Sequence, residues 1–282
     1  MSHVDREHAR EKAEQVLECL TTILSSPGKL EKFSAALPLA RICILLLGDH
    51  PTSVVASQIL LIIGLTLNQS SSFNRKFELV SGWSILRSAL PGAWDPSVHV
   101  AAFDILLGRS ASDIHRSPQT LKPPKVSCPY ILPAILSSLD RGLTDVASGG
   151  EIILNDNVGK CRNQPFLAHC LSKLQSVPTA RGGMAIDSAM DVLVEELIDL
   201  HSSSSSFREI FKSQQSTSRL AAACRSFVNM VTGDSEVRRR TMRILEKVTH
   251  LMLMLALSDH VDAAHKQEVR SSFLSVSLSP TN

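Results

Sequence analysis

The sequence predicts an all-α protein, and more specifically an armadillo- or HEAT-like α-solenoid of stacked helix pairs. Three observations lead there. Apolar residues recur at a spacing of three and four along most of the chain, and no segment alternates as a strand does. Aromatic residues, which strands favour, make up only 4% of the 282 residues. Several expected helices are apolar on more than one side, which suits helices packed between neighbours in a stack.

The first 109 residues are predicted to form N-terminal helical repeats. The opening helix, at about residues 5–24, has one apolar stripe, and Pro27 followed by Gly28 ends it. The helices after it are separated by glycine, proline or short polar turns. They are expected at residues 30–47, 52–67, 73–80, 83–90 and 97–107.

The composition changes after residue 109. Residues 110–127 are polar and proline-containing, and are predicted to be a linker or a long loop. C-terminal helical repeats are expected over residues 128–274, with an irregular loop at 144–185, followed by a disordered tail at 275–282. The helices of this half are expected at residues 128–143, 166–174, 186–200, 207–212, 217–231, 235–257 and 259 to about 275, with a turn at 201–206.

Two short stretches match each other and indicate an internal repeat. SSSFNRKF (70–77) and SSSFREIF (204–211) each follow an apolar helix and place two phenylalanines four residues apart. Their separation equals three units of about 45 residues, a length typical of armadillo and HEAT repeats. Because serine runs match each other easily, coincidence is the alternative. In either case a polar turn ends one helix and the phenylalanine pair anchors the next.

Charge and cysteine usage exclude several classes of protein. The net charge is +2, from 29 basic and 27 acidic residues, so no nucleic-acid partner is expected. The six cysteines form no C-x-x-C pair and no export signal opens the sequence, so reduced thiols in a cytoplasmic protein are expected. The longest apolar runs, at 59–67 and 251–257, are far shorter than the roughly 20 residues that span a bilayer. We expect a cytoplasmic protein, at most peripheral to endomembranes.

No residue pattern predicts catalysis, a cofactor or a metal ion. Cys161, His169 and Cys170 lie close in sequence but lack the spacing of metal ligands. Neither a nucleophile motif nor a phosphate-binding loop occurs. The chain is therefore predicted not to be an enzyme, and the alternative is a helical enzyme with its site in the 144–185 loop.

The densest basic cluster is the candidate binding surface. Arg239, Arg243 and Lys247 share one face of the helix expected at 235–257, and are the predicted partner-binding residues for an acidic protein surface. The alternatives are that the basic helix 238–247 binds anionic lipid, or that this face is merely solvated. Acidic residues on one face of another helix would neutralise these three basic side chains if the two faces packed against each other. This acidic stripe consists of Asp187, Asp191, Glu195 and Asp199.

Three stretches carry a resemblance to a known family: residues 77–109, residues 190–228 and, more weakly, residues 129–139. Together they resemble the armadillo-like helical region that precedes the PH, BEACH and WD40 modules of fungal beige/BEACH-domain proteins, which are related to neurobeachin and the Chediak–Higashi protein. The resemblance covers about half of the chain. The positions that carry it are Phe77, Gly82, Trp83, Leu86, Leu90, Pro91, Trp94, Phe103, Leu107, Phe207, Phe211, Gln214, Gln215 and Phe227.

The resemblance implies a scaffold that is cytosolic and peripheral to membranes, with no catalytic residues to carry over. BEACH and WD40 sequences are missing, so it also implies a fragment, a separate gene model or a truncated product. We therefore expect a non-enzymatic scaffold that binds protein partners in vesicle trafficking, vacuolar or lysosomal sorting, or autophagy. Trp83 and Trp94 are expected in the core, with exposed anchors for a partner as the alternative.

Overall fold

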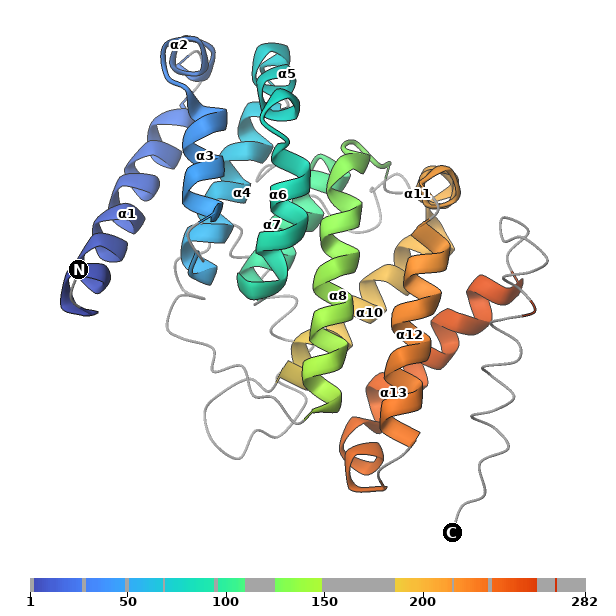
Figure 1. Cartoon of the computed structure of the whole chain (residues 1–282). Helices are drawn as coiled ribbons and strands as arrows, with labels where there is room; N and C mark the ends of the chain where they lie inside the picture. Colours follow the sequence, from blue (N-terminus) through green and yellow to red (C-terminus); the bar gives the residue numbers. More distant parts are fainter. Residues whose placement is uncertain are drawn as a thin grey trace. The chain divides into compact units, whose positions relative to one another are not determined.

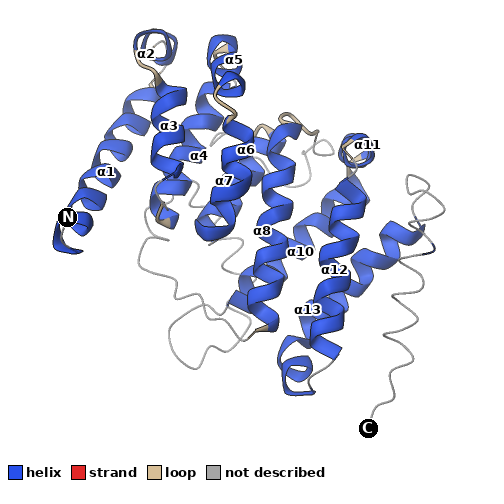
Figure 2. Ribbon diagram, viewed as in Figure 1, coloured by secondary structure: helices blue, strands red, loops and turns tan. Residues whose placement is uncertain are grey.

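The computed structural model shows an all-α protein (Figure 1). It describes residues 3–26, 29–48, 51–67, 69–93, 96–109, 125–148, 186–214, 216–232, 235–257 and 267. Every regular element within these residues is an α-helix or a short 3-10 helix, and none of them is a strand (Figure 2). The all-α prediction is confirmed, and the solenoid arrangement of the whole chain stays a prediction.

The helices are grouped into two compact units. The first unit contains α1 to α7, η3 and the start of α8, and the second contains the rest of α8 and α10 to α13. Among the described helices, none is both long and apolar enough to cross a bilayer. In chain order they are α1 (His3–Leu24), α2 (Leu30–Ala36), α3 (Leu39–Gly48), α4 (Ser53–Leu67), α5 (Ser71–Leu79), α6 (Gly82–Ala89), the 3-10 helix η1 (Leu90–Ala93), α7 (Pro96–Leu107), the 3-10 helix η3 (Pro129–Ile131), α8 (Leu132–Ala147), α10 (Ile186–Ser203), α11 (Ser205–Ser213), α12 (Ser216–Thr232) and α13 (Ser235–Leu257).

In the first unit, helices pack against the helix that comes three places later in the chain. The long helix α1 packs against α4, and α4 packs against α7. The intermediate helix α3 packs against α6. The short helices α2 and α5 contact each other and lie across the long ones, so that both are seen end-on in Figure 1. Within this unit, helices three places apart in the chain are therefore packed neighbours.

The helix α4 is enclosed by its neighbours. It contacts α1, α3, α5 and α7, and residues 54–60 are all buried. Its polar Gln58 forms a hydrogen bond of 3.0 Å with the hydroxyl of Thr21 on α1. A helix that is apolar on all sides has to be covered on all sides. The sequence predicts this position for the segment, and the structure confirms it.

In the second unit, α13 packs against both α12 and α10. The helix α10 packs against α13, three helices further on, while the short α11 contacts both α10 and α12. The helix α8 approaches α10 closely, because a Cβ atom on Gly142 would lie 2.2 Å from Sδ of Met190. The largest fully buried side chains of this unit include those of Phe207, Phe211 and Phe227.

The two matching sequence stretches form matching structures. The helices α5 and α11 are both nine residues long and begin one residue after an extended serine, Ser70 or Ser204. In each case the serine Oγ accepts a hydrogen bond from the backbone N–H three residues on, at 3.3 Å for Phe73 and 3.2 Å for Phe207. The phenylalanine pairs are buried in both helices. The two stretches therefore form the same local structure, and in each the serine before the helix caps it, a role that the sequence analysis did not assign.

Removing either capping hydroxyl is expected to destabilise its own unit. The variants Ser70→Ala and Ser204→Ala leave a helix N–H without its acceptor, which typically costs about 1 kcal/mol of unfolding free energy. Urea denaturation followed by circular dichroism measures this. The control is Ser205→Ala, since Ser205 is exposed at the first position of α11. Equal losses for Ser205→Ala and Ser204→Ala would show that the caps contribute nothing specific.

Prolines and serines account for two differences from the expected helices. The helix predicted over residues 30–47 is broken into α2 and α3, because Pro38 lacks an N–H and its ring clashes with the preceding turn. The turn predicted at 201–206 is wrong, since α10 continues to Ser203 and only Ser204 leaves the helix. The hydroxyls of Ser202 and Ser203 donate to carbonyls four residues back, and so allow serines inside the helix.

The polar segments are only partly described. The helix α8 runs to Ala147, so the loop predicted to begin at residue 144 does not begin there. At the end of the predicted linker, residues 125–127 are non-helical and Val126 is buried. The rest of that linker, the remainder of the 144–185 loop with its helix at 166–174, and the tail at 275–282 lie outside the described residues. The predicted domain boundaries stay predictions.

Candidate functional site

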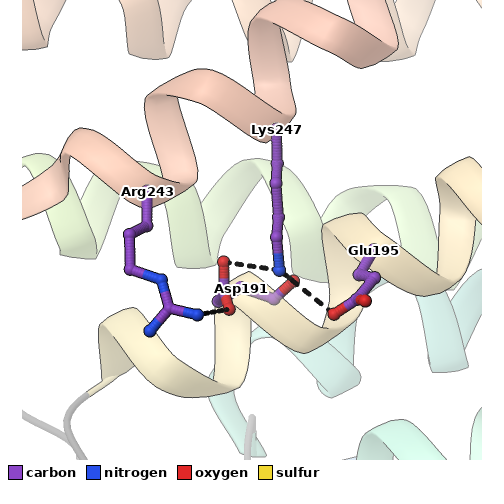
Figure 3. Close-up of polar contacts among 4 residues, drawn as sticks. All are labelled: Asp191, Glu195, Arg243 and Lys247. Atoms are coloured by element: carbon purple, nitrogen blue, oxygen red, sulfur yellow. Dashed lines mark hydrogen bonds and ion pairs between the residues drawn. The ribbon is translucent and has the colours of Figure 1, made fainter. Parts of the chain in front are cut away.

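The predicted basic cluster on α13 lies opposite the predicted acidic stripe on α10 (Figure 3). The ammonium group of Lys247 is 2.8 Å from Oδ1 of Asp191 and 3.1 Å from Oε2 of Glu195. The guanidinium of Arg243 is 3.9 Å from the other carboxylate oxygen of Asp191. Two cations therefore meet two carboxylates across the interface of α10 and α13.

Burial differs among the members of this cluster. Asp191 and Lys247 are mostly buried, with 13% and 24% of their side chains exposed, whereas Arg243 is 61% exposed. Arg239, one turn before Arg243, is exposed. A charge that is partly removed from water needs a partner nearby, and Asp191 supplies it for Lys247. The acidic stripe therefore neutralises part of the basic cluster, at Lys247 and Arg243.

This arrangement affects the predicted partner-binding residues unequally. Lys247 is paired with carboxylates of the same chain and therefore presents little charge to another molecule. Arg239 and Arg243 are exposed on α13, and Arg243 also pairs with Asp191. The acidic stripe is only partly involved: Asp199 is exposed further along α10, and the side chain of Asp187 lies outside the described residues. Partner binding by Arg239, Arg243 and Lys247 stays a prediction.

The cluster is expected to stabilise the α10–α13 interface measurably. In a double-mutant cycle of Asp191→Asn and Lys247→Met, we expect a coupling energy of about 1 kcal/mol, because both groups are mostly buried. The control cycle is the exposed pair Arg141–Asp145, at 3.0 Å on α8, for which we expect about 0.3 to 0.5 kcal/mol. Urea unfolding at low and high salt measures both. A coupling at Asp191–Lys247 no larger than the control would contradict a role in holding the two helices.

A second candidate surface lies in the first unit and is aromatic. Trp83 on α6 stacks on Tyr130 of η3 with ring centroids 5.9 Å apart, and meets the edge of Phe77 at 5.0 Å. Trp83 is half-buried, and Tyr130 is 52% exposed. Trp83 is thus neither a core residue nor a free anchor. Trp94 lies outside the described residues.

Local backbone contacts hold Tyr130 in place. The backbone N–H groups of Ser127 and Cys128 donate to the carbonyl of Leu106 at the end of α7, at 2.8 and 3.2 Å. Pro129 then starts η3, which contacts both α6 and α7. Sequence reasoning missed Tyr130. The available signal was weak: it is the chain's one tyrosine, and it directly follows a proline at the start of an expected helix.

Arg87 lies one helical turn beyond Trp83 on α6, on the same face of that helix, and is exposed. Tryptophan, tyrosine and arginine are the residue types that most often dominate binding energy at protein interfaces. We name the group Trp83, Tyr130 and Arg87 the aromatic surface.

Within the described part of the chain, no group of three or more potential ligands is placed to hold a metal ion. The predicted Cys161, His169 and Cys170 lie outside that part. Burial raises the pKa of the thiols of Cys43 and Cys224 to about 12, and that of Cys128 to about 11. A nucleophilic cysteine needs the opposite shift. These three thiols are held in the neutral form.

The cysteines are expected to differ in reactivity. Iodoacetamide at pH 8 should alkylate the exposed Cys19 rapidly and leave Cys43 and Cys224 unmodified until the chain unfolds. Because an unfolded thiol ionises near pH 8.5, and the folded ones do so only at higher pH, the chain should lose stability as pH rises above about 8.5. Peptide mass spectrometry after timed alkylation measures the first effect, and urea unfolding at pH 7.5 and 9.5 the second. Alkylation of Cys43 as fast as of Cys19 would contradict the burial.

Comparison of the chain with protein-family models, with curated proteins and with solved structures found no match.

Proposed function

We propose that this chain is a non-enzymatic scaffold that binds a protein partner through the aromatic surface of its first unit. The observation that carries the proposal is the Trp83–Tyr130 stack, which is half exposed although its backbone is fixed. Large, rigid aromatic side chains bind a partner at low entropic cost, because few rotatable bonds have to be ordered.

The packing of the first unit supports this role. Triplets of helices bury one side and leave turns and short helices at the surface, which is how repeat proteins present binding residues. The residues that carry the resemblance to beige/BEACH-domain proteins are mainly packing residues: Phe77, Leu86, Leu90 and Phe103 are all buried. They fit a scaffold of that kind. On this basis we propose a role in vesicle trafficking, vacuolar or lysosomal sorting, or autophagy, in the cytoplasm and peripheral to endomembranes.

Anionic lipid binding by helix 238–247 is the competing proposal, and the ion pairs count against it. Electrostatic attraction to a membrane requires cations that are free to face the headgroups, with each contributing about 1 kcal/mol. Lys247 is already paired with Asp191 and Glu195. The basic helix therefore offers a weaker cationic surface than its sequence indicates.

Proximity labelling in cells with the full chain tests the proposal. We expect a reproducible set of labelled proteins, enriched in trafficking components, that is lost when Tyr130 is replaced by serine. The control variant is Val16→Ser on α1, which alters another exposed apolar residue of the same unit. An identical set for Tyr130→Ser and the unchanged chain would contradict the aromatic surface as the contact site.

Vesicle sedimentation tests the competing proposal separately. The full chain is mixed with neutral vesicles and with vesicles containing phosphatidylserine. Binding to the anionic vesicles alone, lost in a triple variant of Arg239, Arg243 and Lys247 to alanine, would favour the lipid role. We expect no such binding.

A further inference from the structure

The short helices α2 and α5 carry exposed cations at one edge of the first unit. The two helices contact each other at one end of the long helices (Figure 1), and a hydrogen bond of 3.3 Å joins the hydroxyls of Ser34 and Ser70. Four cationic side chains are exposed on these helices or directly before α2: Lys29, Lys32, Arg75 and Lys76. None of the four forms an ion pair within the described part of the chain.

This edge keeps an excess of positive charge. The same two helices carry two acidic residues, Glu31 and Glu78, so two positive charges remain over. Glu78 is exposed, and the side chain of Glu31 lies outside the described residues. The basic cluster on α13 differs in this respect, because Lys247 and Arg243 already face carboxylates of α10. The cations of α2 and α5 are therefore free to attract an anionic partner.

An exposed leucine lies among these cations. Leu79 is one helical turn beyond Arg75, on the same side of α5, and is 76% exposed. The opposite side of α5, with Phe73 and Phe77, is buried. Helices that bind at a membrane surface combine cations with exposed aliphatic or aromatic side chains in this way. We call Lys29, Lys32, Arg75, Lys76 and Leu79 the cationic edge.

The matching helix α11 shows that the fold does not require this surface. It has the same capping serine and the same buried pair of phenylalanines as α5. At the positions equivalent to Arg75, Lys76 and Leu79 it carries different residues, namely Glu209, Ile210 and Ser213. The same local structure is thus built with and without the cations and the leucine. Packing of the helix therefore does not explain them.

The composition of the cationic edge favours a membrane over a protein as its partner. Three of its four cations are lysines, and its exposed neighbours on the two helices include Ala36, Ser71 and Ser72. Lysine, serine and alanine are depleted at protein–protein interfaces, where arginine and aromatic residues are enriched. Anionic lipid headgroups attract each lysine or arginine near the membrane surface, and these attractions accumulate over the cations present.

We propose that the cationic edge binds the anionic headgroups of a lipid membrane, with Leu79 inserted at the boundary between headgroups and acyl chains. The four cations attract the headgroups, and burial of the leucine adds to the binding energy. This contact lies outside the aromatic surface of the proposed function and does not depend on it. It also differs from lipid binding by helix 238–247, because it uses none of that helix's residues.

Sedimentation of the full chain with vesicles tests this contact. We expect binding to vesicles of phosphatidylcholine and phosphatidylserine in equal amounts, and none to phosphatidylcholine alone. A graft variant gives α5 the residues of α11: Arg75→Glu, Lys76→Ile and Leu79→Ser. It should bind the anionic vesicles at least about tenfold more weakly, because it removes two cations and adds a carboxylate. About 1 M NaCl should also release the unchanged chain, since it screens exposed charges within about 3 Å.

The control matches the graft variant in charge. Lys212→Ile with Arg219→Glu makes the same change in net charge at exposed positions of the second unit, and should bind like the unchanged chain. Urea unfolding followed by circular dichroism checks that the graft variant is folded. A second variant, Lys29→Gln with Lys32→Gln, removes cations from the edge without altering α5 and should also weaken binding.

The outcomes separate this contact from its competitors. Equal binding to both kinds of vesicle, or none to either, overturns the proposal, and so does an equal loss in the graft variant and its control. A graft variant that keeps vesicle binding but loses proximity-labelled proteins would assign the edge to an acidic protein instead. Tyr130→Ser and the triple alanine variant on α13 should bind vesicles like the unchanged chain, so failure here is distinct from failure of the aromatic surface.

Discussion

Replacing Phe77 with alanine is expected to lower the free energy of unfolding by about 3 to 5 kcal/mol. The Phe77 ring is fully buried, stacks on Phe73 at 5.7 Å and meets Trp83 at 5.0 Å. Truncation removes the apolar area and both ring contacts, and leaves a cavity that its fixed neighbours cannot close. Urea denaturation followed by circular dichroism and tryptophan fluorescence gives the loss, since Trp83 reports on the same cluster.

The phenylalanine pair of α11 allows the same experiment to be repeated independently. Phe211 is likewise buried, with its ring centroid 5.1 Å from that of Phe207. Phe211→Ala is therefore expected to cost a similar amount. Leu79→Ala, on the same helix as Phe77 but 76% exposed, should change stability by less than about 0.5 kcal/mol. A loss below about 1 kcal/mol in both phenylalanine variants would refute the phenylalanine pair as a packing anchor.

Gly82→Ala is expected to lower the unfolding free energy by about 2 to 3 kcal/mol, although alanine is normally the better helix former. A Cβ atom at Gly82 would lie 2.4 to 2.6 Å from three atoms of the Phe77 ring. That ring is confined between Phe73 and Trp83, so it cannot move aside without opening the cluster. The cost of overpacking exceeds the gain in helix propensity.

A glycine in open space is the matched control for Gly82. Gly48, the last residue of α3, has no atom within 4 Å of its Cβ position. Gly48→Ala should therefore be neutral or stabilise the chain by up to about 1 kcal/mol. Thermal unfolding of the two variants side by side provides the measurement. Equal melting temperatures for them would contradict the tight approach of α6 to Phe77.

The helices were predictable where a local pattern decides them. The capping serines and phenylalanine pairs of α5 and α11 act within one helical turn, and the all-round apolar sequence of α4 indicates neighbours on all sides. The break at Pro38 was also encoded locally, in a proline ring that cannot continue a helix. The extension of α10 through Ser203 was not apparent, because the same serine hydroxyls can end a helix or bond back into it.

The candidate sites depended on contacts between distant segments. Arg243 and Lys247 were recognisable as one face of a helix. That they meet Asp191 and Glu195 depends on how α10 and α13 pack, which spacing along one helix does not determine. Tyr130 belongs to the aromatic surface only because the carbonyl of Leu106 holds the chain that enters η3. Packing between elements, rather than the pattern within them, decided both surfaces.

The enclosure of α4 restricts the substitutions that this helix can accept during evolution. With residues 54–60 buried and neighbours on several sides, almost every exchange in this helix alters a volume that some other helix must match. Among homologues, α4 should accept only apolar substitutions of similar size, and often in concert with changes in α1 or α7. The outer side of α1, around Val16, is free of that constraint and should vary fastest.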